Sequence, residues 1–122
     1  MPRTILIVDD DPDVLNALRG GLESQGYRIL TAGDGLEGVQ ICCADRPDFI
    51  ILDFHMPGGG GTTVYEALRE LRGTLETPIL FLTGVPVDTV KDNVRFRGRT
   101  DFLAKPASLE AILRIIKQAL GG

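Results

Sequence analysis

The sequence has no apolar run near the ~18 residues that a membrane-spanning helix needs. Its N-terminus, MPRTILIVDD, also lacks the long apolar segment of a signal peptide. Positive charge is not in excess: the formal net charge is -4, which excludes a general attraction to nucleic acid or to an anionic membrane. We therefore expect a cytoplasmic protein that neither enters a membrane nor binds nucleic acid directly.

Cysteine is scarce, and the two that occur, Cys42 and Cys43, are adjacent. Neighbouring residues of one helix point in different directions, so they are poor disulfide partners. Two thiols without further ligands also make a poor metal site. We interpret both cysteines as small buried hydrophobic residues in a reducing compartment.

The length of 122 residues matches one ordinary domain. Hydrophobic residues make up 43%, enough for a core, and the 25% of charged residues argues against disorder. The chain contains no internal repeat or low-complexity segment, and the short run GGGG at 58–61 is interpreted as a loop. We expect a single domain over residues 1–122.

Short apolar runs recur along the chain at ILIV (5–8), RILTA (28–32), FIILD (49–53), ILFLT (79–83) and FLA (102–104). They are too short for helices and do not alternate with polar residues. Such runs are typical of strands buried on both faces, which predicts a mostly parallel sheet.

Helical spacing of apolar residues separates these runs. The predicted core stripes are Leu15, Leu18 and Leu22; Leu36, Val39 and Cys43; Val64, Leu68 and Leu71; and Leu109, Ile112, Leu113, Ile116 and Leu120. The predicted caps are Asp11 followed by Pro12, Asp34 with Glu37, Thr63 with Glu66, and Ser108. The segment 87–96 carries β-branched valines and predicts only a short or mobile helix.

Five alternating β-α units predict an α/β fold: a doubly wound (βα)5 three-layer sandwich of the flavodoxin-like kind. The common order for five parallel strands is 2-1-3-4-5. In that order ligands bind at the carboxyl ends of the first and third strands.

Four of the predicted strands end in a residue able to do chemistry. Asp9 and Asp10 end the first, Asp53 the third, Thr83 the fourth and Lys105 the fifth. Neighbouring strands lie about 4.8 Å apart, so the carboxylates after the first and third strands can share one ion. The long lysine stem can cover much of the roughly 10 Å between the fifth strand and the third. Asp11 is expected to cap the first helix instead.

These residues predict phosphoryl chemistry around a hard cation. Carboxylate oxygens suit Mg²⁺, which binds one or two carboxylates together with phosphate oxygens. Asp53, ionised beside a metal, can attack phosphorus and form an acyl phosphate, while Lys105 neutralises charge and the Thr83 hydroxyl donates a hydrogen bond. The structural alternative is helix capping and surface ion pairing, but the gathering of five such residues at one sheet edge favours a site.

The motifs ILIVDDDP, DFIILDFHMPGGGG, PILFLTG and DFLAKP resemble, in order and spacing, the receiver domains of two-component response regulators, the CheY-like superfamily. The resemblance covers essentially the whole chain. It implies that Asp53 is the phospho-acceptor and that Mg²⁺, with Mn²⁺ as an alternative, binds Asp10 and Asp53 directly and Asp9 through water. The backbone carbonyl of His55 would complete the metal contacts.

The same resemblance assigns roles on the neighbouring strands. Thr83 and Lys105 would hold the phosphoryl group, and Phe102 matches the switch aromatic residue. The Lys105–Pro106 bond matches a bond that is usually cis in the family, whereas only about 5–6% of X-Pro bonds are cis in general.

The family implies a phosphorelay switch and not an enzyme. A sensor histidine kinase or a histidine phosphotransfer protein would donate the phosphoryl group, and the domain would assist its own phosphorylation and dephosphorylation. The surface of the fourth helix, fifth strand and fifth helix would then change and control an effector protein or an output domain outside this chain. Phosphorylation-dependent homodimerisation is a further option.

Several residues depart from the family pattern. His55, two residues after the acceptor, either influences hydrolysis of the acyl phosphate or is a solvated loop histidine. Gly59 and Gly60 make the loop 58–61 unusually glycine-rich. Arg99 follows Gly98 where the family has alanine, which puts the usual packing of the fourth helix in doubt. The basic residues there are a docking patch or, as we favour, a solvated surface: Arg95, Arg97 and Arg99.

Two other functions compete with the switch. A degenerate receiver would keep the fold as an interaction module without phosphate. An Asp-nucleophile, Mg²⁺-dependent phosphatase would need a second carboxylate two residues after the nucleophile, where this chain has His55. A flavodoxin-like cofactor binder is disfavoured, because the loop after the first strand is acidic and not a phosphate cradle.

Overall fold

The computed structural model of the chain describes residues 2–56, 60–93, 96 and 98–121. Its strands are β1 (Thr4–Val8), β2 (Arg28–Ala32), β3 (Phe49–Asp53), β4 (Ile79–Thr83) and β5 (Thr100–Ala104). Its helices are α1 (Pro12–Glu23), α2 (Gly35–Asp45), α3 (Gly61–Glu70), α4 (Val87–Asn93) and α5 (Leu109–Leu120). All strand pairs are parallel and the sheet order is β2-β1-β3-β4-β5, as predicted.

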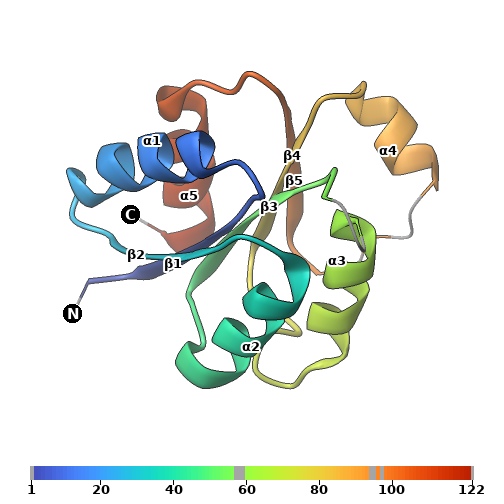
Figure 1. Cartoon of the computed structure of the whole chain (residues 1–122), viewed down its shortest axis with the longest axis horizontal. Coiled ribbons are helices and arrows are strands. Elements are labelled where there is room, and N and C mark those ends of the chain that lie inside the picture. Colours follow the sequence, from blue (N-terminus) through green and yellow to red (C-terminus); the bar gives the residue numbers. More distant parts are fainter. Residues whose placement is uncertain (1, 57–59, 94–95, 97, 122) are drawn as a thin grey trace.

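The sheet is the middle of three layers (Figure 1). Helices α1 and α5 lie side by side on one face, and α2, α3 and α4 cover the other. The strands β1, β3 and β4 are buried along their whole length, whereas the edge strands β2 and β5 are partly exposed. This confirms the prediction of strands buried on both faces for the runs of β1, β3 and β4, while the two edge runs are strands that are only partly buried.

Two separate cores fill the spaces between the layers. The core under α1 and α5 is mainly aliphatic and includes Leu22, Leu80, Ile112 and Ile116. The core under α2, α3 and α4 contains rings as well as aliphatic side chains, with Tyr65 and Phe81 both fully buried.

Three of the predicted helix starts are confirmed. The side chain of Asp11 accepts a hydrogen bond from the Asp13 amide at 2.9 Å, with Pro12 opening α1. Asp34 accepts from the Glu37 amide at 2.8 Å, and Ser108 accepts from the Ala111 amide at 3.1 Å. Each cap satisfies an amide that the first turn of its helix leaves unbonded.

The predicted cap of α3 is wrong. The helix begins at Gly61 with Gly60 at the N-cap, so Thr63 and Glu66 lie inside it and no side-chain cap forms. The backbone explains this early start, because Gly61 lies against the end of β3. A Cβ at this position would lie 2.6 Å from the Asp53 carbonyl oxygen. Only glycine fits such a close approach.

The predicted core stripe of α2 is only partly right, because Val39 packs against the core but Leu36 and Cys43 do not. Leu36 is 72% exposed and Cys43 is exposed, whereas Gly38 and Cys42 are buried. A Cβ on Gly38 would lie 3.0 Å from a Val8 methyl group, so the helix packs on β1 through its smallest residues. Because Leu36 precedes Gly38 by two residues, about 200° around the helix, it points away from the sheet.

Helix α4 is short, with seven residues, as the valine pattern predicted. The predictions for Gly58, Gly59, Arg95 and Arg97 lie outside the described residues. Within the described part of the chain, none of the helices is long and apolar enough to cross a membrane.

Candidate functional site

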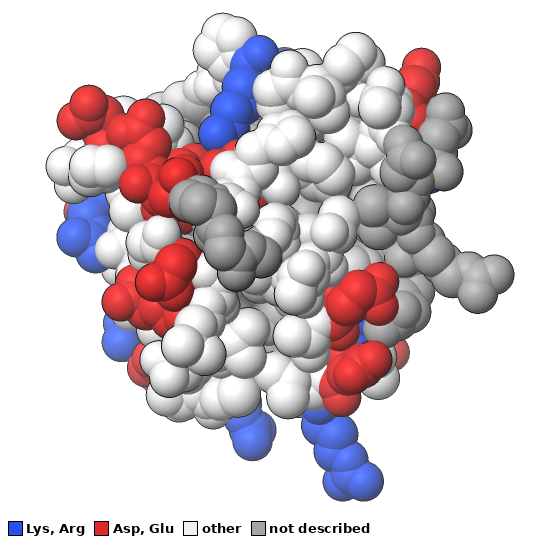
Figure 2. Space-filling model, turned by 45° about the vertical axis from the view of Figure 1, so that its right-hand side comes forward, with Lys and Arg blue, Asp and Glu red and all other residues white. Residues whose placement is uncertain are grey.

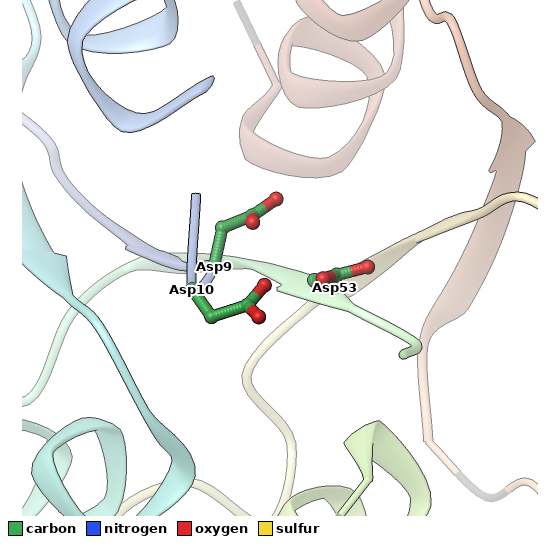
Figure 3. A group of neighbouring side chains, drawn as sticks. All are labelled: Asp9, Asp10 and Asp53. Carbon is green, nitrogen blue, oxygen red and sulfur yellow. The ribbon is translucent and has the colours of Figure 1, made fainter. Parts of the chain in front are cut away.

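The ends of β1 and β3 bring three carboxylates together. Asp9 and Asp10 follow β1, and Asp53 is the last residue of β3. One oxygen of each lies within 4.8 Å of the others, and Figure 3 shows the side chains projecting from the two strand ends toward the same space. Asp9 and Asp53 are buried, while Asp10 is exposed. A parallel register of β1 and β3, with Val8 opposite Leu52, aligns these ends.

Lys105 reaches this cluster from the end of β5. Its Nζ lies 3.0 Å from Asp53 Oδ1 and 3.4 Å from Asp9 Oδ2. Its backbone amide donates a hydrogen bond to the Thr83 carbonyl at 2.7 Å, which anchors the residue to the end of β4. The lysine stem therefore spans the distance that the strand order left between β5 and β3.

Backbone amides hold two of the carboxylates in place. The Asp11 amide donates to Asp9 Oδ1 at 2.9 Å, and the His55 amide donates to Asp53 Oδ1 at 3.3 Å. Asp11 itself caps α1. The three consecutive aspartates thus serve different purposes, because Asp9 and Asp10 face the cluster and Asp11 starts the helix.

The surroundings shift the pKa values of Asp9 and Lys105. Burial raises the pKa of Asp9 above its ordinary value and Asp53 adds to this, outweighing the Asp11 amide and Lys105, which lower it. Burial lowers the pKa of Lys105, but the hydrogen bonds and charges of Asp53 and Asp9 more than compensate and raise it overall. The site is therefore short of positive charge, with three carboxylates around one ammonium group.

Such a cluster fits a small divalent cation. All three side chains offer oxygen ligands within mutual reach, and hard cations such as Mg²⁺ prefer carboxylate oxygen. Acidic side chains also gather densely at the upper left of the face shown in Figure 2, where one basic side chain reaches into the group. A cation at the carboxylates would relieve the repulsion among them.

Thr83 and Phe102 lie on the two strands beyond Asp53. Thr83, the fully buried last residue of β4, hydrogen-bonds through its hydroxyl to the Val85 carbonyl at 3.2 Å and the Val85 amide at 3.1 Å. Phe102, in β5, stacks on Phe81 with ring centroids 5.7 Å apart. The Thr83 hydroxyl is thus engaged within its own loop.

The other predicted features are as follows. The Lys105–Pro106 peptide bond is cis, as the resemblance implied. His55 is exposed, and its ring lies edge-on to Phe54 with centroids 4.9 Å apart. Arg99 is exposed, and its Nε lies 3.7 Å from an Asp101 carboxylate oxygen, so its side chain faces solvent and not the α4 packing.

Sequence reasoning missed the surroundings of Phe102. Phe81 and Phe96 both pack on its ring, and Tyr65 packs on each of them. It also missed Arg69, whose side chain is fully buried. The one available signal was the position of Arg69 within a stripe of buried residues of α3, four residues after Tyr65.

Comparison with known proteins agrees with this geometry. Residues 5–117 match the family model of the response regulator receiver domain. Protein PilH of Pseudomonas aeruginosa is 35% identical over 97% of this chain and 98% of its own length. Response regulator MprA of Mycolicibacterium vanbaalenii is 40% identical over 98% of this chain, which spans about half (51%) of that relative.

Solved structures give the same result. The chemotaxis protein CheY4 of Vibrio cholerae superposes with a TM-score of 0.91 and 30% identity, covering 98% of this chain and 99% of that one. The receiver domain of the sensor histidine kinase PA1611 of Pseudomonas aeruginosa has a TM-score of 0.89 and 28% identity over the full length of both, and holds a magnesium ion in its active-site cleft. The chain described here belongs to the response regulator receiver domain family of two-component systems.

Proposed function

We propose that this receiver domain takes a phosphoryl group onto Asp53 from a phosphohistidine of a partner protein and responds by changing its α4–β5–α5 surface. One observation carries the proposal. The Asp53 carboxylate lies 3.0 Å from the Lys105 ammonium group and forms, with the carboxylates of Asp9 and Asp10, a cluster that fits a divalent cation. The donor would be a sensor histidine kinase or a histidine phosphotransfer protein.

The chemistry follows from the groups present. An Asp53 oxygen attacks phosphorus, a P–O bond forms, and the P–N bond to the donor imidazole breaks, which leaves that imidazole neutral after protonation. The Lys105 ammonium group stays paired with Asp53 and offsets the negative charge that builds up on the phosphoryl oxygens. No base is needed, because a carboxylate nucleophile is already ionised at neutral pH.

A divalent cation completes this site. Mg²⁺, or Mn²⁺ in its place, would be held by Asp9, Asp10, Asp53 and the backbone carbonyl of His55. When bound, it supplies charge neutralisation for the transferring phosphoryl group and relieves the carboxylate repulsion. The protein residues fix the acceptor through the His55 amide and orient Asp9 through the Asp11 amide.

The response begins at Thr83. Its hydroxyl now bonds to Val85 in the β4–α4 loop, and a phosphoryl group on Asp53 offers it charged oxygens instead. Moving Thr83 toward the phosphoryl group pulls this loop inward and opens space for Phe102 on the neighbouring strand. The two arrangements form a two-state element that phosphorylation biases.

The donor protein must cover the surface beside Asp53. Next to Lys105 lies an apolar hollow of about 410 Å³ between α1 and the β5–α5 loop. It is lined by Val14, Ala17, Leu18, Leu82, Lys105, Pro106, Ala107 and Ile112. Because Lys105 belongs to both the hollow and the site, a donor whose histidine approaches Asp53 also contacts the hollow. We therefore place the donor on α1 and this loop.

The domain acts as a regulatory acceptor and not as a catalyst with turnover on other substrates. It would control an effector protein or an output domain outside this chain, and a phosphorylation-dependent homodimer is one form that control takes. We assign it to the cytoplasm and treat residues 1–122 as one receiver unit. A degenerate receiver that never carries phosphate is the main alternative, and a phosphatase lacks its second carboxylate at His55.

Acetyl phosphate with Mg²⁺ tests the proposal. Intact mass spectrometry should find one added phosphoryl group on the parent chain, and none on Asp53→Asn or in EDTA. Asp13→Asn, which removes an exposed neighbouring carboxylate, serves as the matched control and should still be labelled. An unlabelled parent chain would favour the degenerate receiver. Rapid turnover of many equivalents of a simple phosphomonoester would favour the phosphatase.

A further inference from the structure

The rings of the chain are unevenly distributed. Five of them, from Phe54, Tyr65, Phe81, Phe96 and Phe102, form one connected cluster on the face of the sheet under α3 and α4. Phe49 and Tyr27 belong instead to the aliphatic core on the other face. The cluster is therefore centred on Phe81 and includes Phe102, the residue that matches the switch aromatic.

Phe96 occupies a central position in this cluster. It lies between the end of α4 and the start of β5, and its half-buried ring contacts three others. The centroid distances are 4.7 Å to Phe102, 5.3 Å to Tyr65 and 5.6 Å to Phe81. All three contacts are edge-to-face, the arrangement that aromatic pairs prefer.

One neighbour of Phe96 is firmly anchored. Tyr65 is fully buried, its hydroxyl lies 2.8 Å from Thr100 Oγ1 at the first residue of β5, and the Arg69 guanidinium lies 5.1 Å from its ring centre. Arg69 in turn donates hydrogen bonds to the carbonyls of Thr74, Thr77 and Arg99, at 2.9, 2.7 and 3.0 Å. Tyr65 is thus tied to α3, to the α3–β4 loop and to the start of β5.

A second neighbour of Phe96 is Phe102, the residue that the proposed switch moves. Phe102 touches Phe81 of β4 and Phe96 of the α4–β5 loop, and the Nζ of Lys91 in α4 lies 5.3 Å from its ring centre. Its contact with Phe96 has the shortest centroid distance of those in the cluster that the structure describes. If Phe102 moves toward Thr83, it must give up this contact.

We infer that Phe96 is a second aromatic residue of the switch, which holds Phe102 in its present place against the fixed Tyr65 and so links the switch to the α4–β5 loop. This inference rests on the proposed function. Phe96 opposes activation, because its edge-to-face contact with Phe102 exists only before Phe102 moves. Removing the ring shifts the equilibrium toward the activated arrangement and raises the apparent affinity for a phosphoryl mimic.

The test uses the full chain labelled with 3-fluorotyrosine, titrated with beryllofluoride in saturating Mg²⁺ and followed by fluorine NMR. The label on Tyr65 reports on the cluster, and the label on Tyr27 is an internal reference in the other core. The variants are Phe96→Leu, Phe96→Tyr, which keeps the ring, and Phe49→Leu, the same change on the other face. Melting curves verify that each variant is folded.

In the parent chain the Tyr65 resonance should move on titration and the Tyr27 resonance should not. Phe96→Leu should bind beryllofluoride about 2- to 10-fold more tightly, the factor expected for losing one edge-to-face contact. Phe96→Tyr and Phe49→Leu should bind like the parent. Unchanged affinity in Phe96→Leu, with normal binding to the parent, would overturn the role of Phe96 alone. An absence of binding to the parent chain would overturn the proposed function as well.

Discussion

The two faces of the sheet are built from different side chains. Under α1 and α5 the core is almost entirely aliphatic, and both helices begin at a side-chain cap. Under α3 and α4 the core holds four packed rings around Phe81 and the buried guanidinium of Arg69, and α4 has only seven residues. The first face has the features of a fixed scaffold, and the second is held by directional contacts.

This difference matters because both faces meet at the same strand ends. Asp9, Asp53 and Lys105 lie at the strand ends, whereas the Thr83 hydroxyl bonds to Val85 in the β4–α4 loop and Phe102 packs against the core under α3 and α4. Aliphatic packing resists change uniformly, whereas edge-to-face rings and hydrogen bonds have discrete alternative partners. A signal at Asp53 should therefore be transmitted through the core under α3 and α4, while the aliphatic core under α1 and α5 keeps its packing.

The largest expected effect is on the α3 side. Arg69→Met removes the hydrogen bonds that the buried guanidinium donates to the carbonyls of Thr74, Thr77 and Arg99, and it should lower the free energy of unfolding by about 3 kcal/mol or more. Urea unfolding followed by circular dichroism measures the change. Arg72→Met, an exposed arginine three residues later, should stay within about 0.5 kcal/mol. Equal losses for the two variants would refute the role given to the buried guanidinium.

The second effect lies where α3 meets the site. Gly61→Ala forces a Cβ against the backbone of Asp53 and Phe54 and should cost about 1–3 kcal/mol while slowing phosphorylation. Gly60→Ala, whose Cβ would lie 3.5 Å from the Phe54 carbonyl oxygen, should be tolerated. Unfolding curves and acetyl phosphate labelling give both quantities. A harmless Gly61→Ala would mean that the close approach of α3 to β3 is not needed.

A core change on the α1–α5 face should affect stability without affecting the switch. Ile116→Val removes one methyl group from a fully buried position and should cost about 0.5–1.5 kcal/mol. Beryllofluoride affinity should remain that of the parent chain. A several-fold change in that affinity would remove the distinction drawn between the faces.

The smallest effect concerns the shared carboxylates. Because folding raises the pKa of Asp9, ionisation of this carboxyl group disfavours the folded state. The resulting loss of stability develops as the pH rises through the folded-state pKa. In EDTA at neutral pH, Asp9→Asn should therefore be more stable than the parent. The stability gain of the variant should vanish when the pH falls below 3.8, the pKa of the aspartate in the unfolded chain. Mg²⁺ should stabilise the parent more than the variant. A parent melting temperature that does not change with Mg²⁺ would contradict the metal assignment.

Much of the fold is readable from local sequence. The runs 28–32, 49–53 and 79–83 became strands with the predicted bounds, because apolar runs of this length, rich in β-branched and aliphatic residues, favour strands over helices. The α2 stripe was partly misread because glycine does not register as a core residue, although Gly38 is what allows α2 to approach Val8. The α3 cap was misread for a similar reason, since Gly61 starts the helix by close approach to Asp53.

The candidate site was also largely readable, because strand order places residues that end neighbouring strands together. The sequence could not reveal the partners of Arg69, which are carbonyls of residues 74, 75, 77 and 99 from two loops. Nor could it reveal that Phe96 folds back onto Phe102, because ring contacts of this kind depend on tertiary geometry. The features that distinguish the two faces are therefore those that only the structure supplies.

The most direct test is an amide proton–nitrogen correlation spectrum of the parent chain in Mg²⁺, with and without beryllofluoride, with Asp53→Asn as the control. The account predicts that the largest shifts outside the site occur at Thr83, Lys91 and Phe102, while Leu22, Ile112 and Ile116 barely move. Shifts of similar size on both faces, or shifts confined to residues 9–10, 53 and 105, would contradict it.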